Sequence, residues 1–190
     1  MKVSSSTHLV FSVHGLLQPL ANRKVLATSE DISLRADFPF PPRRWELVYF
    51  EITIPRIDDT VKWDSTDFVS LGFCGEFCDL TQAQPGWNVW SVGYHGDNGG
   101  IYEEKGSQPT YSTERKFGPG DTVGCGIDYD TEEYFFTLGA EVVGTFLANF
   151  LYDRDLLIVK CIQPTTQHLR SFTGSYTLLL VTVDKLAKSS

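Results

Sequence analysis

Several short stretches of the chain alternate apolar and polar residues. From Val48 to Ile54 every second residue is apolar, and the residues between are Tyr, Glu and Thr. A period of two with one apolar face is the pattern of a half-buried β-strand. Residues 68–74 repeat it with small residues on the second face, which indicates that another layer approaches that face closely. Further strands are expected at residues 89–94, 122–128, 134–138, 156–162 and 176–183.

Turn-forming residues separate these stretches. Gln84–Gly86, Gly96–Gly100 and Gly118–Asp121 are rich in Gly, Pro, Asn or Asp, the residues that mark turns. Helix signals are scarce, and one short helical turn is expected near Ala148–Tyr152. Many short strands joined by turns are typical of an all-β sandwich or barrel. A length of 190 residues suits a single domain of this kind.

Composition agrees with this fold class and limits the function. Aromatic residues make up 13% of the chain, and aromatic side chains favour pleated, half-buried surfaces. The 24 acidic residues outnumber the 16 basic ones, so the formal net charge is -8. This charge disfavours binding to nucleic acids and to anionic membranes, because both carry phosphate groups. No apolar run approaches the roughly 20 residues of a membrane-spanning helix.

Cysteine placement favours a reducing compartment. Cys74, Cys125 and Cys161 fall within apolar, strand-like runs, so buried, reduced thiols are expected there and at Cys78. A zinc site needs four ligands, and no second Cys or His pair has suitable spacing. We therefore expect no metal and a cytoplasmic protein. Residues 9–20 loosely resemble a signal peptide but contain polar interruptions, which favours a folded N-terminal segment over a secreted protein.

Catalytic chemistry is not predicted. No Gly-x-Ser-x-Gly nucleophile motif occurs, and His95 is expected to bond loop backbone, with Asp97 fixing its tautomer. The acidic run Asp128–Glu133 lacks the bend glycine of a calcium loop and is interpreted as a solvated strand connection. Trp87 and Trp90 could form a sugar-stacking platform, but core packing is the favoured interpretation. We therefore expect no enzyme and no cofactor.

An ordered set of motifs resembles a known family. The run Pro85–Gly99 (PGWNVWSVGYHGDNG) resembles the signature of SPRY domains of the Ran-binding-protein-M type. The resemblance extends from about Ser29 to Gly174. It is also carried by Arg35–Pro42, Tyr49–Ile52, Val69–Cys74, Gly120–Asp128 and Tyr134–Thr137.

The resemblance implies a bent β-sandwich of two antiparallel sheets, of the concanavalin-A-like and SPRY type. It predicts one domain over residues 1–183, with an N-terminal packing segment, and a tail at 184–190. The implied function is recognition of a short segment of a partner protein by loops at one end, by a monomer without membrane insertion. Substrate recognition in a ubiquitin-ligase assembly or a sorting adaptor is implied. The alternatives are a secreted effector of a plant parasite and a carbohydrate-binding lectin.

The same resemblance places the partner-binding surface on loops and their borders. Tyr102 matches an aromatic position that contacts peptides in related proteins. The proline-rich segment containing Pro41 is expected to be extended, and it could be a rim of the site or an edge that avoids strand pairing. The expected contact residues are Arg35, Pro41, Arg43, Glu76, Phe77, Tyr102 and Gln163.

Two regions depart from the family pattern. Gly139-Ala140 stands where family hairpins carry Asn-Gly. A leading Gly suits a type II′ turn, whereas Asn-Gly suits type I′, so a hairpin with a different turn is expected. Leu151–Asp155 and the last strand also differ from the family sequences.

Overall fold

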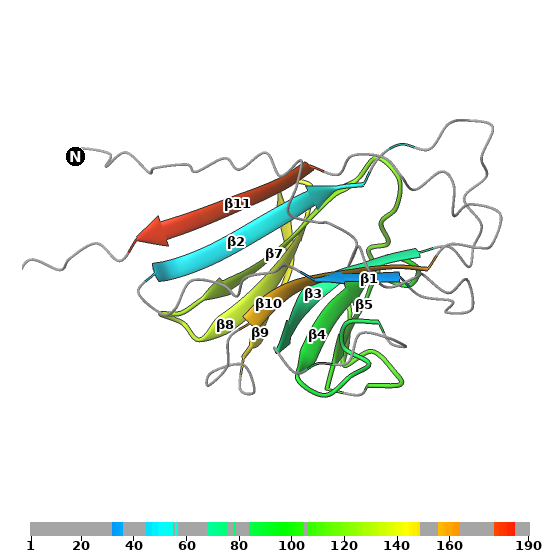
Figure 1. The fold of residues 1–190 in the computed structure, drawn as a ribbon, viewed down its shortest axis with the longest axis horizontal. Helices are drawn as coiled ribbons and strands as arrows, with labels where there is room; N and C mark the ends of the chain where they lie inside the picture. The colour runs from blue at the N-terminus through cyan, green and yellow to red at the C-terminus, as the bar shows by residue number, and fades with distance from the viewer. Residues whose placement is uncertain are drawn as a thin grey trace, which may run out of the picture.

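The chain forms a sandwich of two antiparallel sheets in the computed structural model (Figure 1). The structure describes residues 32–35, 45–54, 56, 68–75, 78, 84–104, 106–148, 156–163 and 177–184. Sheet A has six strands in the order β1-β10-β3-β4-β5-β6, and sheet B has five in the order β11-β2-β7-β8-β9. The all-β, two-sheet fold class predicted from the sequence is confirmed.

The strands of sheet A come from both ends of the described chain. In sheet order they are β1 (Ile32–Arg35), β10 (Leu156–Gln163), β3 (Phe68–Gly75), β4 (Ser91–His95), β5 (Gly100–Glu103) and β6 (Tyr111–Ser112). Those of sheet B are β11 (Thr177–Asp184), β2 (Trp45–Thr53), β7 (Thr122–Asp128), β8 (Glu133–Leu138) and β9 (Glu141–Leu147).

The alternation of β2 builds one half of the core. Val48, Phe50 and Ile52 are buried, whereas Thr53 is exposed. The Phe50 ring meets Phe73 of sheet A edge-on, with 5.8 Å between the ring centroids. Apolar faces of the two sheets therefore pack against each other, as the period of two predicts.

All seven strands expected from alternation or apolar runs are present, within three residues at each end. Four others, β1, β5, β6 and β9, had no predicted range. β1 and β5 have four residues each and β6 has two, too few to show a period. β9 is irregular because Gly144 interrupts it and its register with β8 shifts next to Phe136 and Thr137.

The hairpin between β8 and β9 has the predicted turn. Leu138 pairs with Glu141, so Gly139 and Ala140 form a two-residue loop. Gly139 has φ +62° and Ala140 has no positive φ. A type I′ turn needs positive φ at both positions, so this combination is that of type II′.

The acidic run is a strand connection, as predicted. It joins the end of β7 to the start of β8. One carboxylate oxygen of Asp128, Oδ1, accepts hydrogen bonds from the backbone N–H groups of Asp130 and Thr131, at 2.8 and 3.1 Å. This arrangement is an Asx-turn, in which the carboxylate satisfies backbone donors of the loop.

Some sequence predictions lie outside the described residues. They concern the apolar N-terminal stretch, the proline-rich segment and the helical turn after Ala148. Among the thiols, Cys74 and Cys125 are fully buried, and Cys78 is nearly so. Burial raises the pKa of the Cys125 thiol well above its usual value. In the part of the chain that the structure describes, no helix is long and apolar enough to cross a bilayer.

Candidate partner-binding surface beside Tyr102

A loop over residues 84–90 covers the outer face of sheet A. Gly93 of β4 lies directly beneath it, where a Cβ would come within 2.3 Å of the Pro85 carbonyl oxygen. Ser70 of β3 donates a hydrogen bond to the buried Gln84 side chain. The small residues of β3 and β4 thus admit the second layer that the sequence predicted, and that layer is this loop.

The loop is closed by its own hydrogen bonds. The Ser91 hydroxyl accepts from the Gly86 N–H and donates to the Asn88 carbonyl oxygen, each at 2.8 Å. Gly86 has φ +88°, and a Cβ there would lie 2.4 Å from the Tyr102 carbonyl oxygen. Both its conformation and the closeness of β5 therefore require glycine at this position.

His95 anchors the loop to β4. Its side chain is buried, and Nε2 lies 2.7 Å from the Pro85 carbonyl oxygen. A carbonyl oxygen only accepts, so Nε2 carries a proton and donates. Burial lowers the pKa of His95 to about 4, although the bond to Pro85 opposes this shift. The predicted backbone-bonding histidine is confirmed, and the group that fixes Nε2 as the donor is Pro85.

Three aromatic rings pack together on this face, and we call them the aromatic cluster: Trp87, His95 and Tyr102. The His95 and Tyr102 ring centroids are 4.2 Å apart. The Trp87 ring lies 5.4 Å from His95 and 6.1 Å from Tyr102, nearly perpendicular to the latter. Trp87 is 38% exposed, whereas Tyr102 is 5% exposed. The cluster therefore presents an indole to solvent on two buried rings.

This exposure corrects one expectation and refines another. Core packing was predicted for Trp87, and that prediction is wrong, because the residue follows a Pro-Gly turn that places it above the sheet. Tyr102 lies in β5 beside this loop, but most of its ring is covered. Its hydroxyl accepts a hydrogen bond of 2.7 Å from the Asn98 side chain. Asn98 is exposed, so the Tyr102 hydroxyl meets the surface at that end.

The strand register relates Tyr102 to another predicted contact residue. Arg35 pairs with Val159, Val159 with Gly72, Gly72 with Gly93, and Gly93 with Tyr102. Arg35 and Tyr102 therefore belong to one row across sheet A. Four strand spacings of about 4.8 Å put their backbones about 19 Å apart, which is the reach of an extended segment of roughly six residues.

The other predicted contact residues are less well placed or are not described. Gln163 pairs with Phe68, four positions along β10 from the row of Arg35 and Tyr102. Gly75, which ends β3, lies toward the opposite end of the strand from Phe68. Pro41, Arg43, Glu76 and Phe77 lie outside the described residues.

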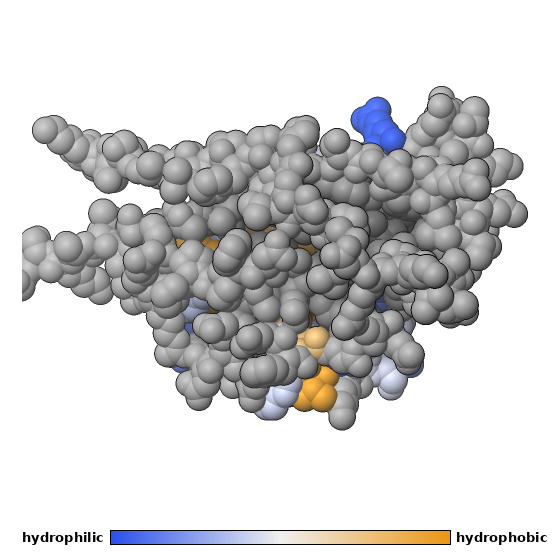
Figure 2. Space-filling model, viewed as in Figure 1, coloured by the Kyte–Doolittle hydropathy of each residue, from blue (hydrophilic) through white to orange (hydrophobic). Residues whose placement is uncertain are grey.

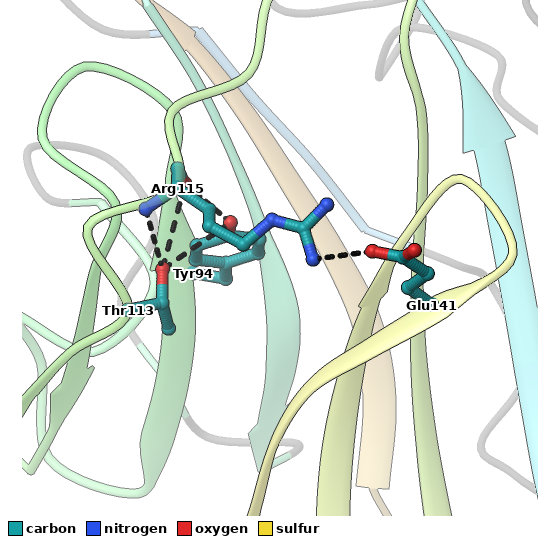
Figure 3. Close-up of polar contacts among 4 residues, drawn as sticks. All are labelled: Tyr94, Thr113, Arg115 and Glu141. Carbon is teal, nitrogen blue, oxygen red and sulfur yellow. Dashed lines mark hydrogen bonds and ion pairs between the residues drawn. The ribbon is translucent and has the colours of Figure 1, made fainter.

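Polar contacts hold the neighbouring loop in place (Figure 3). The Tyr94 hydroxyl donates to the Arg115 carbonyl oxygen, and the Thr113 hydroxyl donates to that of Gly99 at 2.7 Å. The Arg115 guanidinium then reaches Glu141 of β9 at 2.8 Å. These bonds connect the turn that carries Asn98 to both sheets. Among the described residues, no group of three or more His, Cys, Asp or Glu side chains could hold a metal ion.

Comparisons with known proteins agree with this architecture. A family model of the SPRY domain matches residues 47–175, which is more than half of the chain. The chain belongs to the SPRY family. The resemblance noted from the motifs is thereby confirmed. SPRY domains are a protein-interaction fold, so the chain is a protein-interaction module by family.

Individual relatives cover part of the chain. A Ran-binding protein M homolog of Arabidopsis thaliana is 38% identical over 96 residues, 50% of this chain and 19% of that protein. Human SPRY domain-containing protein 3 is 32% identical over 102 residues, 51% of this chain and 21% of that protein. The chain thus spans about a fifth of the length of these relatives. The crystal structure of a human SPRY domain superposes with a TM-score of 0.56 at 23% identity, covering 80% of this chain and 84% of that one, and it supports the fold alone.

Proposed function

We propose that the chain binds a short, extended segment of a partner protein across the outer face of sheet A. The observation that carries this proposal is the exposed Trp87 indole, which rests on the buried rings of His95 and Tyr102. Binding hot spots are enriched in Trp and Tyr held by rigid surroundings, because little conformational entropy is lost when such residues are covered. Here the rigidity comes from the close contact of the 84–90 loop with Gly93 and from the hydrogen bonds within that loop.

The row from Arg35 to Tyr102 sets the path of the bound segment. Trp87 and Tyr102 provide its apolar end and Arg35 a cationic end, while Pro41 and Arg43 complete the rim. Glu76 and Phe77, which follow β3, and Gln163, at the end of β10, are proposed as further contacts. His95 is neutral above about pH 4 because its pKa is lowered. It therefore adds no charge to the surface near neutral pH.

The wider role follows the family. We propose a monomeric, cytoplasmic recognition subunit, with residues 1–183 as one domain, that supplies substrate binding to a ubiquitin-ligase or sorting assembly. It would perform no catalysis and need no cofactor. The names of the Ran-binding relatives support a role in protein assemblies. A secreted effector would use the same surface on a host protein.

A carbohydrate-binding lectin is the second candidate, because an exposed indole is also what a sugar ring stacks on. Affinity capture with the whole chain from its native cell, followed by peptide mapping, tests the first proposal. A glycan array tests the second. Binding to a mapped peptide without any glycan signal is expected, and glycan binding that needs Trp87 would overturn the peptide assignment.

Point variants separate the contact residue from its support. Trp87→Ala is expected to weaken binding of the mapped peptide by tenfold or more, with a small change in melting temperature, and Trp87→Phe should lose less. Tyr102→Ala removes a buried ring and should lower stability by about 3 kcal/mol as well as binding. Thr53→Ala, on the outer face of sheet B, is the matched surface control. A Tyr102 variant that stays folded and binds normally would contradict the site.

A further inference from the structure

Apolar side chains reach the surface at a second place, on the edge strands of the two sheets. In Figure 2 hydrophobic surface shows at the lower edge of the molecule, below β4 and β5, and the exposed apolar residues of β6 and β9 are a further set. Four large hydrophobic residues are exposed among those described, and three of them, Tyr111, Val142 and Leu147, belong to β6 or β9. The fourth is Trp87. The edge therefore concentrates exposed apolar surface away from the aromatic cluster.

β9 is the end strand of sheet B, and among the described strands it pairs on one side, with β8 (Figure 1). Val142, Thr145 and Leu147 pair with Thr137, Phe135 and Glu133, so they share the outer face of the sheet with those residues. Val142 is 59% and Leu147 60% exposed. An end strand leaves half of its backbone N–H and C=O groups directed away from the sheet.

Natural edge strands are commonly protected by lysine or proline. β9 has neither, and its sequence Glu-Val-Val-Gly-Thr-Phe-Leu is rich in β-branched residues. On its inner face Phe146 stacks on Tyr111 of β6, with ring centroids 4.3 Å apart. This contact closes the sandwich between the two edge strands. The rings of Tyr111 and Phe146 form an apolar surface, and an additional strand could place side chains beside it.

Acidic residues lie at both ends of β9, and one of them already has a cationic partner. Glu141 begins β9 and is exposed, and its carboxylate pairs with the Arg115 guanidinium at 2.8 Å. At the other end Leu147 pairs with Glu133, and the Ala148 N–H bonds the Glu132 carbonyl oxygen at 3.0 Å. Oppositely charged residues that face each other across strands stabilise a sheet, whereas like charges destabilise it. With a net charge of -8, this edge favours a basic strand over a second copy of the chain.

We propose that β9 pairs with an extended, basic segment of another protein, which adds a sixth strand to sheet B. The segment would alternate apolar with polar residues, so that one set packs on Val142 and Leu147. A lysine or arginine near one end would reach across Leu147 toward Glu133 of β8. This surface is separate from the one beside Tyr102 and does not depend on it.

Selection from a displayed library of random ten-residue peptides tests the proposal. The whole chain is the bait. Peptides that also bind a Val142→Lys, Leu147→Lys double variant are discarded, because their binding does not need β9. Enriched peptides are expected to alternate and to be basic. A synthesised representative should bind the unmodified chain at least tenfold more tightly than the double variant and slow amide exchange in β9. Thr145→Lys should weaken binding severalfold, whereas Thr53→Lys, at another exposed threonine of sheet B, should not.

Three results would overturn the proposal. The first is a selection that yields no basic peptide whose binding depends on β9. The second is that the β9 amides of the unliganded chain exchange as slowly as those of β7, which would mean that the chain covers this edge itself. The third is concentration-dependent dimerisation, by sedimentation, that the lysine substitutions abolish, which would assign the edge to a second copy.

Discussion

The outer faces of the two sheets both contain glycines, but these glycines are covered in different ways. On sheet A, backbone of the 84–90 loop lies against Gly93. On sheet B, side chains of neighbouring strands cover Gly124 and Gly126. A Cβ at Gly124 would lie 2.1 Å from the Tyr49 hydroxyl, and one at Gly126 would lie 2.3 Å from the tip of the Phe135 ring.

The outer faces of sheets A and B therefore differ in which residues they can offer to a partner. Tyr49 and Phe135 stack parallel with 5.8 Å between centroids, and the Tyr49 hydroxyl bonds Thr137 at 2.8 Å. Sheet B therefore covers its glycines with residues of its own strands. Sheet A uses a separate loop, and that loop carries an exposed tryptophan. A loop on a rigid floor can vary in sequence without loss of the sheet, which is how binding surfaces arise on such folds.

The largest effect is expected at Gly93. Gly93→Ala forces a methyl group against the Pro85 backbone, which cannot move without breaking the His95 bond. We expect the free energy of unfolding to fall by about 3 kcal/mol, as measured by urea denaturation. Truncation of a neighbouring side chain should not restore stability. Unchanged stability would show that the loop does not rest on this glycine.

Acid should weaken sheet A through His95. Its pKa is about 4 in the fold against 6.5 for an unperturbed histidine, so the unfolded chain binds the proton more tightly. Stability is fully present above pH 6.5 and is lost as the pH falls toward 4, by about 2 kcal/mol at pH 5. Urea titrations at pH 7 and pH 5 should show this loss. His95→Gln should reduce it, and an equal loss in that variant would assign it to other groups.

Gly124 offers the matched test on sheet B. Gly124→Ala meets side-chain atoms of Tyr49 and Thr137, which can shift, so a smaller loss of about 1–2 kcal/mol is expected. Adding Tyr49→Ala should recover part of the loss caused by the new methyl group. A double-mutant cycle measured by thermal denaturation gives this coupling. If Tyr49→Ala gives no recovery, side-chain cover is not what requires glycine at this position.

Gly139 should show the smallest effect, because conformation alone requires glycine there. No atom lies within 4 Å of a Cβ at this position, but φ is +62°. Gly139→Val should therefore cost about 1 kcal/mol and lower the melting temperature. Replacement of Gly139-Ala140 by Asn-Gly should be tolerated, since a type I′ turn also closes a two-residue hairpin. A melting temperature unaffected by valine would contradict the turn type.

Local patterns were sufficient for several elements of this fold. The alternation from Val48 to Ile54 predicted which side chains of β2 are buried, because each strand residue points to the face opposite its neighbour's. The order of Gly139 and Ala140 predicted the turn, because one residue with positive φ distinguishes the two hairpin types. His95 was predicted to bond loop backbone. These properties depend on residues adjacent in the chain or on a single burial preference.

The position of the binding surface depends on contacts between distant residues. Arg35 and Tyr102 share a row because β10, from far along the chain, pairs between β1 and β3. Trp87 is exposed because Pro85 rests on Gly93, a contact that hydropathy does not encode. β9 becomes an edge because no described strand follows it in sheet B. Strand order and layer contacts are set by packing of the whole sandwich, so tertiary structure decides which aromatic residues stay at the surface.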